Sequence, residues 1–374
     1  MRAGYKQTEI GIIPSDWEVK SIFQVAPLQR GFDLPTREIK IGPFPVVYSN
    51  GVENFHKIAM ATGPGVVTGR SGTLGKVHFI ESDYWPHNTS LWVTRFNEND
   101  PKFIYYFYKS LRFERFTAGS GVPTLNRNVV HSYRIALPKN KSEQKKIAQA
   151  LSDVDSLLGG LKQLITKKRN LKQAIMQQLL TGQIRLSGFN KKWEEKTLVE
   201  IAVISKGVQL HTTETKIDGH FPHYNGGIHP SSFTDRSNTP ANTIAISEGG
   251  NSCGFVHFIS KPFWCGGHCY AVIPNSVDNN FLFYALKGLQ KEIMKLRVGS
   301  GLPNIQKTTL GLFKLKVPKN PVEQKAIAII LFDIDVELTA LEARHDKTQE
   351  LKKGMMQELL TGKTRLVKLG AAHA

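Results

Sequence analysis

Two stretches of this sequence decide its fold: residues 141–186, KSEQKKIAQALSDVDSLLGGLKQLITKKRNLKQAIMQQLLTGQIRL, and residues 321–366, PVEQKAIAIILFDIDVELTALEARHDKTQELKKGMMQELLTGKTRL. A shift of 180 positions aligns them without a gap. The alignment reaches back to Gly119, and roughly 28 of 68 positions are identical. Each stretch alternates apolar spacings of four and three residues, which is the a/d pattern of a coiled coil. We therefore expect two long helices.

The apolar seams are expected to pair the two helices. The seam residues are Ile147, Leu151, Val154, Leu158 and Leu161 in the first copy, and Ile327, Leu331, Ile334, Leu338 and Leu341 in the second. The first copy carries nine basic and three acidic residues and the second seven and eight, so their charges favour an antiparallel pair. The alternative, in which each helix packs only on its own neighbouring domain, remains open. We expect Ser142 to cap the first helix, Gly159-Gly160 to weaken or bend it, and Thr-Gly at 181–182 and 361–362 to end the two helices.

A looser repeat lies upstream of each helix. Trp17-Glu18 matches Trp193-Glu194, and the run Val-His-Phe-Ile occurs at 77–80 and again at 256–259. Both segments alternate short β-rich runs and Gly-rich loops with one aromatic helix-like stretch, which predicts α+β domains. The expected organisation is a first domain (1–140), a helix (141–186), a second domain (187–320), a helix (321–366) and a tail (367–374). The fold class is thus two pseudo-symmetric α+β domains separated by two long helices that pair as an antiparallel coiled coil.

Charge points to a polyanionic partner. The chain has 49 Lys and Arg against 31 Asp and Glu, a net charge of +18, and each expected domain carries +6. Double-stranded DNA is the simplest partner of this kind. No apolar run is long enough to span a membrane and no signal-peptide pattern follows Met1, so we expect a cytoplasmic protein with no membrane partner. Three cysteines in 374 residues suit a reducing compartment.

A small-residue loop in each domain is the first candidate DNA contact. In the first domain the candidate residues of this loop are Arg70, Ser71, Thr73 and Lys76; the matching loop of the second domain offers Glu248 and Asn251. The glycine spacing does not match a Walker A motif. Arginine donates to guanine and glutamate accepts from cytosine, so the two loops would read different bases. A plain β-turn is the alternative.

Two further pairs of polar segments recur. Asn50 and Asn225 each precede glycine, and asparagine can pair with adenine, although Asn-Gly is also common tight-turn chemistry. After the Gly-Ser-Gly repeats at 119–121 and 299–301, the polar residues Asn126, Arg127, Gln306 and Lys307 are candidate phosphate or base contacts.

Metal binding and catalysis are not expected. A zinc site could be built from Cys253, Cys265, His268 and Cys269, but the spacing fits no standard finger and the matching segment 86–90 has no cysteine. The chain lacks the Asp/Asn-Pro-Pro-aromatic motif of DNA amino-methyltransferases, and no nuclease or Ser/His/Asp pattern is evident. We therefore expect neither a metal nor a catalytic residue.

The opening residues 5–19, YKQTEIGIIPSDWEV, together with EQKKIA at 143–148 and LLTG at 179–182 and their copies, resemble DNA-specificity subunits of type I restriction–modification systems. The resemblance implies two target-recognition domains, each reading half of a bipartite DNA target. It also implies two methyltransferase subunits, which modify adenine N6 with S-adenosylmethionine, and ATP-using restriction/translocase subunits. Both cofactors would sit on those partners and none on this chain. The long tail that follows the second helix in the family is missing here, which leaves the circular completion of the symmetry open. A single-chain methyltransferase or nuclease fusion and a generic basic coiled-coil scaffold are the alternatives.

Overall fold

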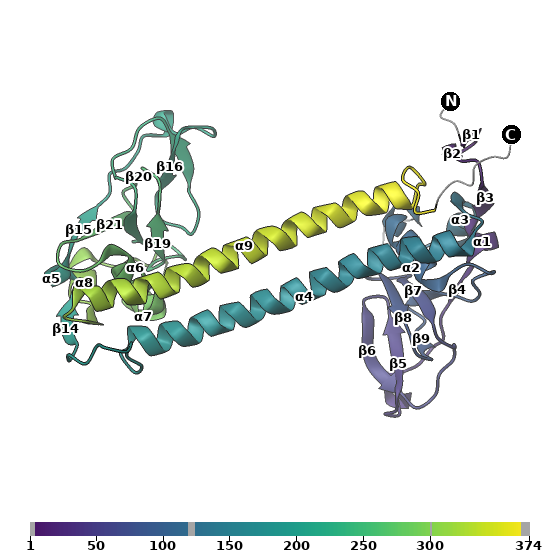
Figure 1. Cartoon of the computed structure of the whole chain (residues 1–374), viewed down its shortest axis with the longest axis horizontal. Helices are drawn as coiled ribbons and strands as arrows, with labels where there is room; N and C mark the ends of the chain where they lie inside the picture. The colour runs from purple at the N-terminus through teal and green to yellow at the C-terminus, as the bar shows by residue number, and fades with distance from the viewer. Residues whose placement is uncertain (1–3, 119–123, 300, 368–374) are drawn as a thin grey trace. The chain divides into compact units, whose positions relative to one another are not determined.

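The computed structural model describes residues 4–118, 124–299 and 301–367. It divides into two compact units: residues 1–162 together with 343–374 form unit 1, and residues 163–342 form unit 2. Each unit therefore contains one β-rich domain, part of the first long helix and part of the second (Figure 1).

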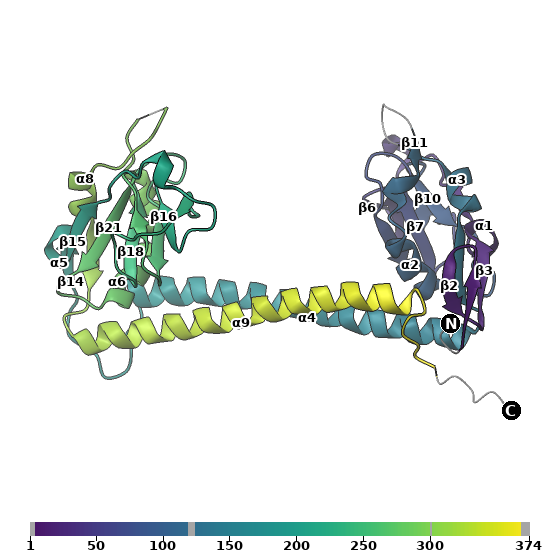
Figure 2. The ribbon, with the colours of Figure 1, turned by 90° about the horizontal axis from the view of Figure 1, so that it is seen from above.

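The domain of unit 1 is built on a four-stranded antiparallel sheet with strand order β4-β10-β7-β8. A three-stranded sheet, β6-β5-β9, and the pairs β1–β2, β11–β12 and β13–β3 complete it. Helix α2 packs on β7 and β8 (Figures 1 and 2). The elements are β1 (Tyr5–Thr8), β2 (Gly11–Pro14), β3 (Trp17–Ser21), α1 (Ile22–Val25), β4 (Leu28–Arg30), β5 (Phe44–Tyr48), β6 (Gly51–His56), β7 (Gly65–Gly69), β8 (Val77–Ile80), β9 (Trp85–Pro86), β10 (Ser90–Val93), α2 (Pro101–Ser110), β11 (Thr117–Ala118), β12 (Thr124–Leu125), α3 (Arg127–Ser132) and β13 (Arg134–Pro138).

The domain of unit 2 repeats this topology. Its four-stranded sheet has the order β15-β21-β18-β19, its three-stranded sheet the order β17-β16-β20, and β14 pairs with β22. Helix α6 packs on β19 and β21 as α2 does on its sheet. The elements are β14 (Glu194–Thr197), α5 (Leu198–Ile201), β15 (Ala202–Lys206), β16 (Phe221–Tyr224), β17 (Ser232–Thr234), β18 (Thr243–Ser247), β19 (Val256–Ile259), β20 (Trp264–Cys265), β21 (Cys269–Pro274), α6 (Asn279–Gly288), α7 (Gln290–Lys295), α8 (Lys307–Gly311) and β22 (Lys314–Val317). The duplicated topology establishes the pseudo-symmetric α+β fold.

The long helices are α4 (Lys141–Leu180) and α9 (Pro321–Leu359). Helix α4 continues through Gly159 and Gly160, where a Cβ would meet open space. Both helices end as expected at a glycine in the left-handed region, Gly182 with φ of 71° and Gly362 with φ of 72°. The amides of Ile184 and Thr364 donate back to carbonyls six residues earlier, which satisfies the ends of the helices.

The expected cap of α4 is wrong by two residues. Asn140, not Ser142, provides the cap, because its Oδ1 accepts from the Ser142 amide at 2.8 Å. Asn320 caps α9 in the same way, accepting from the Val322 amide at 3.0 Å. An amide oxygen one residue before the helix reaches the free N–H groups of the first turn.

The seam residues divide between two kinds of neighbour. Within unit 1, Ile147 and Leu151 lie in the core of the domain, in the same apolar cluster as Leu359 and Leu360 at the end of α9. In unit 2, Ile327 and Leu331 lie in the domain core together with Leu179 of α4, while Ile334 and Leu338 cluster with Ile165 and half-buried Leu341. Leu161 is buried, whereas Val154 and Leu158 are half-buried. The first turns of each helix thus pack on their own domain, and the following turns face the other helix.

Ion pairs between the helices follow the expected charge difference. In unit 2, Lys168 of α4 contacts Glu337 of α9 at 2.6 Å, and Arg169 contacts Glu342 at 2.6 Å. Lys172, one turn after Lys168 on α4, contacts Asp335, which precedes Glu337 on α9, at 2.5 Å, so positions that advance along α4 meet positions that recede along α9, as in an antiparallel pair.

A duplicated contact joins a tyrosine, an aspartate and a lysine from three elements. In unit 1, Tyr106 of α2 donates to Asp155 of α4 at 2.9 Å, and Lys352 of α9 pairs with the same carboxylate. Burial lowers the pKa of Lys352, and burial raises the pKa of Tyr106. In unit 2, Tyr284, Asp335 and Lys172 repeat the contact, with a Lys172–Asp335 distance of 2.5 Å.

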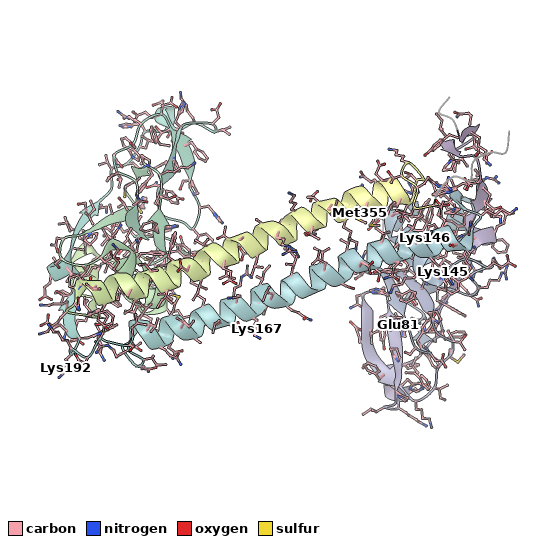
Figure 3. All side chains as sticks on the ribbon, in the orientation of Figure 1. Glu81, Lys145, Lys146, Lys167, Lys192 and Met355 are labelled. Carbon is pink, nitrogen blue, oxygen red and sulfur yellow. The ribbon has the colours of Figure 1, made fainter. Side chains whose placement is uncertain are left out.

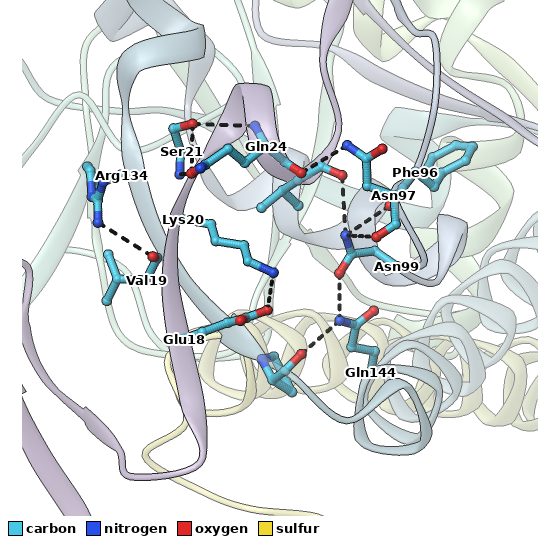
Figure 4. A network of polar contacts seen from close by, with 12 residues as sticks. Glu18, Val19, Lys20, Ser21, Gln24, Phe96, Asn97, Asn99, Arg134 and Gln144 are labelled. Carbon is cyan, nitrogen blue, oxygen red and sulfur yellow. Dashed lines mark hydrogen bonds and ion pairs between the residues drawn. The ribbon is translucent and has the colours of Figure 1, made fainter.

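Each long helix is also locked to its domain by a buried glutamine. Gln144 is 2% exposed, and its Oε1 accepts from the Asp100 amide at 2.8 Å. Its Nε2 donates at 2.8 Å to the Pro138 carbonyl and at 2.8 Å to Asn99, a bond that Figure 4 shows. Gln324 makes the same bonds to Asp278 and Pro318. Since Asp100 and Asp278 are the N-caps of α2 and α6, the glutamines align two helices at once.

The neighbouring glutamate makes a second duplicated contact, which joins the start of each long helix to the segment that follows the other long helix. Glu143, 1% exposed, accepts two bonds from Arg365 at 2.5 and 2.8 Å and one from Trp17 Nε1 at 3.3 Å. Tyr5 also donates to the Gly362 carbonyl at 2.9 Å. In unit 2, Glu323 receives Arg185 and Trp193 in the same manner. The short segment after α9 therefore returns to the first domain.

Candidate nucleic-acid interface

The loop between β7 and β8 depends on its glycines. A Cβ on Gly69 would lie 1.9 Å from the Thr73 carbonyl oxygen, and one on Gly75 would overlap the Glu114 carboxylate. Gly72 and Gly75 have φ of 78°, which other residues rarely adopt. The glycines of the sequence Gly-x-x-Gly-x-x-Gly are therefore needed for the tight fold of the loop.

Three segments of the first domain meet at this loop. The amides of Arg70 and Ser71 donate to the Thr89 carbonyl at 2.9 and 3.2 Å, and the Leu125 amide donates to the Arg70 carbonyl at 2.9 Å. Arg70, Ser71 and Thr73 are half-buried and Lys76 is exposed. The predicted segments at 70–76 and 124–127 are thus brought together, with Thr89 as a neighbour that the sequence did not single out.

Asn50 occupies the two-residue turn of the β5–β6 hairpin, so the turn interpretation accounts for its Asn-Gly sequence. Tyr48 pairs with Gly51 across this turn, and the Asn50 side chain donates to Glu53. The turn lies beside β8, because His78 Nε2 is 3.4 Å from the Ser49 carbonyl. Burial lowers the pKa of His78, which favours the neutral imidazole in this position.

Asn126 and Arg127 begin α3. Asn126 Oδ1 accepts from the Asn128 amide at 3.0 Å as the N-cap of this helix, and both Asn126 and Arg127 are exposed. The oxygen of Asn126 is therefore engaged in capping α3. The Gly-Ser-Gly residues 119–121 lie outside the described residues, as does Ser300 of the second copy.

The second domain brings together the corresponding segments. Gly249 pairs with Asn304 as Ser71 pairs with Thr124 in the first domain. Asn251, Gln306 and Lys307 are exposed, and Lys307 begins α8 as Arg127 begins α3. Both domains therefore pair the loop with the segment before the short helix in the same way, while the side chains at these positions differ.

Glu248 is largely enclosed in the second domain. Its side chain is 12% exposed, and Oε1 accepts from Lys206 at 2.7 Å and from Tyr270 at 3.0 Å, while Oε2 lies 3.9 Å from His268 Nδ1. Burial, followed by the hydrogen bond to this carboxylate, raises the pKa of Tyr270. The exposed polar groups at this place are accordingly those of Lys206 and His268, which the sequence analysis did not identify as DNA contacts.

Asn225 has a structural role. Its Oδ1 accepts from the His268 amide at 3.1 Å, and the neighbouring Gly227 carbonyl lies 2.9 Å from His257 Nε2. His257 thus repeats the position of His78, and burial lowers its pKa as well. The only sequence signal for this shared histidine is the repeated Val-His-Phe-Ile run.

The cysteines are buried free thiols. Cys253 Sγ donates to the Glu248 carbonyl at 2.8 Å, whereas Cys265 and Cys269 neighbour each other in a separate cluster. The Cys265 thiol and burial together raise the pKa of Cys269. Among the described residues no group of three or more His, Cys, Asp or Glu is placed to hold a metal ion. Within the same part of the chain, no helix has the length and apolarity to cross a membrane.

Comparison with known proteins matches this duplicated architecture. The family model described as "Type I restriction modification DNA specificity domain" matches residues 14–167 and again 190–353. The chain therefore belongs to the type I restriction–modification specificity subunits.

Relatives in two organisms agree. A putative type I specificity subunit of Mycoplasma genitalium is 27% identical over 312 residues, covering 79% of this chain and 82% of its own. A putative specificity subunit of the type I restriction enzyme MjaX of Methanocaldococcus jannaschii is 26% identical, covering 97% of each chain. The crystal structure of a type I S subunit from M. genitalium shares the fold, with a TM-score of 0.72 and 24% identity over 96% of this chain and 99% of that one.

Proposed function

We propose that this chain reads a bipartite DNA target, with one half-site bound by each domain. The observation that supports this most directly is the difference between the two domains on a common frame. In both domains the loop pairs with the segment that leads into a short helix. This arrangement presents Arg70, Lys76 and Arg127 in the first domain. In the second domain it presents Lys307 and a Glu248 that is ion-paired with Lys206. Different side chains at equivalent positions suit the reading of different bases.

The proposed DNA contacts retain the predicted residues with their observed surroundings. The exposed cations Lys76, Arg127 and Lys307 are suited to phosphates, and half-buried Arg70 to a base edge. The further candidates are Asn50, Ser71, Thr73, Asn126, Asn225, Glu248, Asn251 and Gln306. We add Lys206 and His268, which lie exposed beside Glu248.

We further propose that the chain carries no catalytic residue and works in a cytoplasmic complex. The helices would dock two methyltransferase subunits that use S-adenosylmethionine, and ATP-using restriction/translocase subunits would join them. The proposed division is 1–140 and 187–320 for the recognition domains, 141–186 and 321–366 for the spacer helices, and 367–374 for the tail. The duplicated glutamine and glutamate contacts, which fix each long helix to its own domain in the same way, support a scaffold built of two equivalent halves.

A domain exchange tests the proposal. Residues 1–140 are replaced by the first domain of another system, and the chain is expressed with its own methyltransferase subunit. Sequencing that detects N6-methyladenine should show one new half-site and one unchanged half-site. A change in both half-sites would contradict the assignment of one half-site to each domain, and methylation by the purified chain without its partner would contradict the non-catalytic role.

A further inference from the structure

Two polar contacts join the domain helix α2 to the long helix α4. At the start of α2, the amide of its N-cap Asp100 donates to Gln144 Oε1 at 2.8 Å. Further along the same helix, Tyr106 Oη donates to Asp155 Oδ2 at 2.9 Å. Gln144 and Asp155 are three turns apart, about 16 Å along α4. One contact alone would let the domain pivot about it, whereas two contacts this far apart fix the angle between α2 and α4.

Unit 2 repeats both contacts with the same spacing along the chain. The Asp278 amide donates to Gln324 Oε1 at 2.7 Å, and Tyr284 Oη donates to Asp335 at 2.9 Å. The tyrosine of each unit is at most 3% exposed, so its hydroxyl is withdrawn from water and depends on the aspartate as its acceptor. The angle of each domain helix is therefore fixed in the same way.

A lysine brings the second long helix into each of these contacts. Lys352 of α9 pairs with Asp155, and its Nζ lies 5.7 Å from the centroid of the Tyr106 ring. One turn further along α9, Met355, which Figure 3 labels, packs against the core of the first domain. Lys172 of α4 has the equivalent place in unit 2, 5.7 Å from the ring of the second tyrosine. Each domain is thus held against both long helices.

The residue before each tyrosine continues the path to the candidate DNA-binding loop. Tyr105 contacts Phe79 of β8, with ring centroids 5.7 Å apart, and β8 begins where the loop 70–76 ends. In unit 2, Phe283 contacts Phe258 of the corresponding strand β19, with ring centroids 5.2 Å apart. Neighbouring residues of one helix therefore contact the strand that carries the loop and the long helices. The placement of each loop relative to the long helices depends on this short path of side chains.

We propose that Tyr106 and Tyr284 are positioning residues that fix the number of base pairs accepted between the two half-sites. This inference rests on the proposed function, in which each domain reads one half-site. Adding or removing one base pair moves a half-site by about 3.4 Å along the DNA axis and turns it by about 35°. A domain that follows this movement turns on the long helices, and the turn breaks its tyrosine–aspartate hydrogen bond of 2.9 Å.

The size of the effect follows from the bond that is broken. A hydrogen bond to a charged acceptor changes an equilibrium by roughly 10- to 150-fold. In the wild type this bond adds to the cost of a wrong gap length, whereas in Y106F or Y284F that cost is absent. Discrimination against a gap that is one base pair too long or too short should therefore fall by about 10-fold or more. The bases read in each half-site should stay the same, because no proposed DNA contact is altered.

The test measures gap selectivity with the complete complex. The chain is co-expressed with its methyltransferase subunit, and adenine methylation is timed on duplexes that keep both half-sites but have the natural gap or a gap one base pair longer or shorter. Y106F and Y284F should each raise the rate on the altered gaps, relative to the natural gap, by about 10-fold or more. Y105F is the matched control, because the Tyr105 hydroxyl accepts from Lys109 of the same helix at 3.2 Å and the second copy has Phe283 in this place. This control should keep the wild-type selectivity.

The possible outcomes are distinct. If Y106F/Y284F methylates the three duplexes in the wild-type ratio, or if Y105F relaxes the ratio equally, the inference is wrong while the bipartite target stands. An equal loss of rate on all three duplexes would give the tyrosines a structural role only and would also overturn the inference. Methylation by the wild-type complex at sites with no bipartite pattern would instead contradict the proposed function. Competition binding to the same duplexes gives the ratio for a variant that methylates slowly, and thermal unfolding followed by circular dichroism checks that each variant is folded.

Discussion

Replacing Arg365 with methionine tests how the segment after α9 holds unit 1 together. Arg365 is 8% exposed in its side chain and binds Glu143, which is 1% exposed. Methionine keeps much of the length and the apolar stem but removes the charge. The substitution leaves a buried carboxylate whose remaining donor is Trp17 Nε1, at 3.3 Å.

The magnitude follows from this burial. Removing one partner of a buried ion pair costs about 3–5 kcal/mol, because the other charge stays buried without compensation. The second contact, to Asp16, is half-exposed and adds at most about 1 kcal/mol. A loss of about 3 kcal/mol corresponds to roughly a 100-fold higher population of locally open molecules.

Hydrogen exchange followed by mass spectrometry measures this opening. Amides in the first turns of α4 and the last turns of α9 should exchange about 100-fold faster in R365M, while those around Glu323 stay unchanged. The matched variant R185M should do the reverse, because Arg185 binds Glu323 at 2.7 Å. The double variant R365M/E143Q should recover much of the protection, since a neutral glutamine needs no countercharge. Unchanged exchange around Glu143 in R365M would refute the reasoning.

The same contact should make unit 1 sensitive to acid. The hydrogen bond from Arg365 holds the pKa of Asp16 below its ordinary value of 3.8. A carboxyl group with a lowered folded-state pKa adds stability above its unfolded pKa and loses it as the pH falls through the folded value. The contribution of Asp16 should therefore be complete above about pH 5 and fall away below pH 3.8. Urea titrations of wild type and D16N should converge at low pH; a constant difference between them would contradict this.

Three further perturbations address the recognition domains. If Lys76 and Arg127 contact phosphates, replacing either one with alanine should reduce the salt dependence of DNA binding by the complex. The slope of the log binding constant against log salt concentration should become shallower by about 1 for each substitution. An unchanged slope would exclude that contact. Gly69→Ala should destabilise unit 1 by about 1–3 kcal/mol in denaturant titrations, because the new Cβ would lie 1.9 Å from the Thr73 carbonyl oxygen. A stability equal to that of the wild type would show that the loop can move. In the folded chain Cys269 should resist iodoacetamide at pH 8, because the adjoining Cys265 thiol and burial raise the pKa of its thiol. The thiol should react after unfolding. Rapid labelling of the folded protein would contradict the burial.

The helices were largely predictable because their information is local. Seam spacing predicted two long helices, and Thr-Gly at 181–182 and 361–362 marked their ends, since a left-handed cap favours glycine. Local pattern failed at the start of α4, where Asn140 and Ser142 are both capable caps and the backbone geometry selected the first.

The candidate site was harder to predict because its side chains come from separate segments. Arg70 lies beside Thr89 and Leu125, which are remote in sequence, and Glu248 is tied by Lys206 and Tyr270. A loop position can be identified from glycines and polar residues, but whether its side chain is available depends on neighbours that folding supplies.

The sequence by itself determined the duplication, the long helices and the positive charge shared by two domains. These follow from residue identity, spacing and composition, which need no knowledge of distant contacts. Tertiary structure alone decided that buried Glu143 and Gln144 fix α4 to its domain and that Arg365 binds Glu143. It also decided that Glu248 is held in an ion pair. A charge or an amide holds two elements together only when burial removes water and folding places a partner within hydrogen-bonding distance.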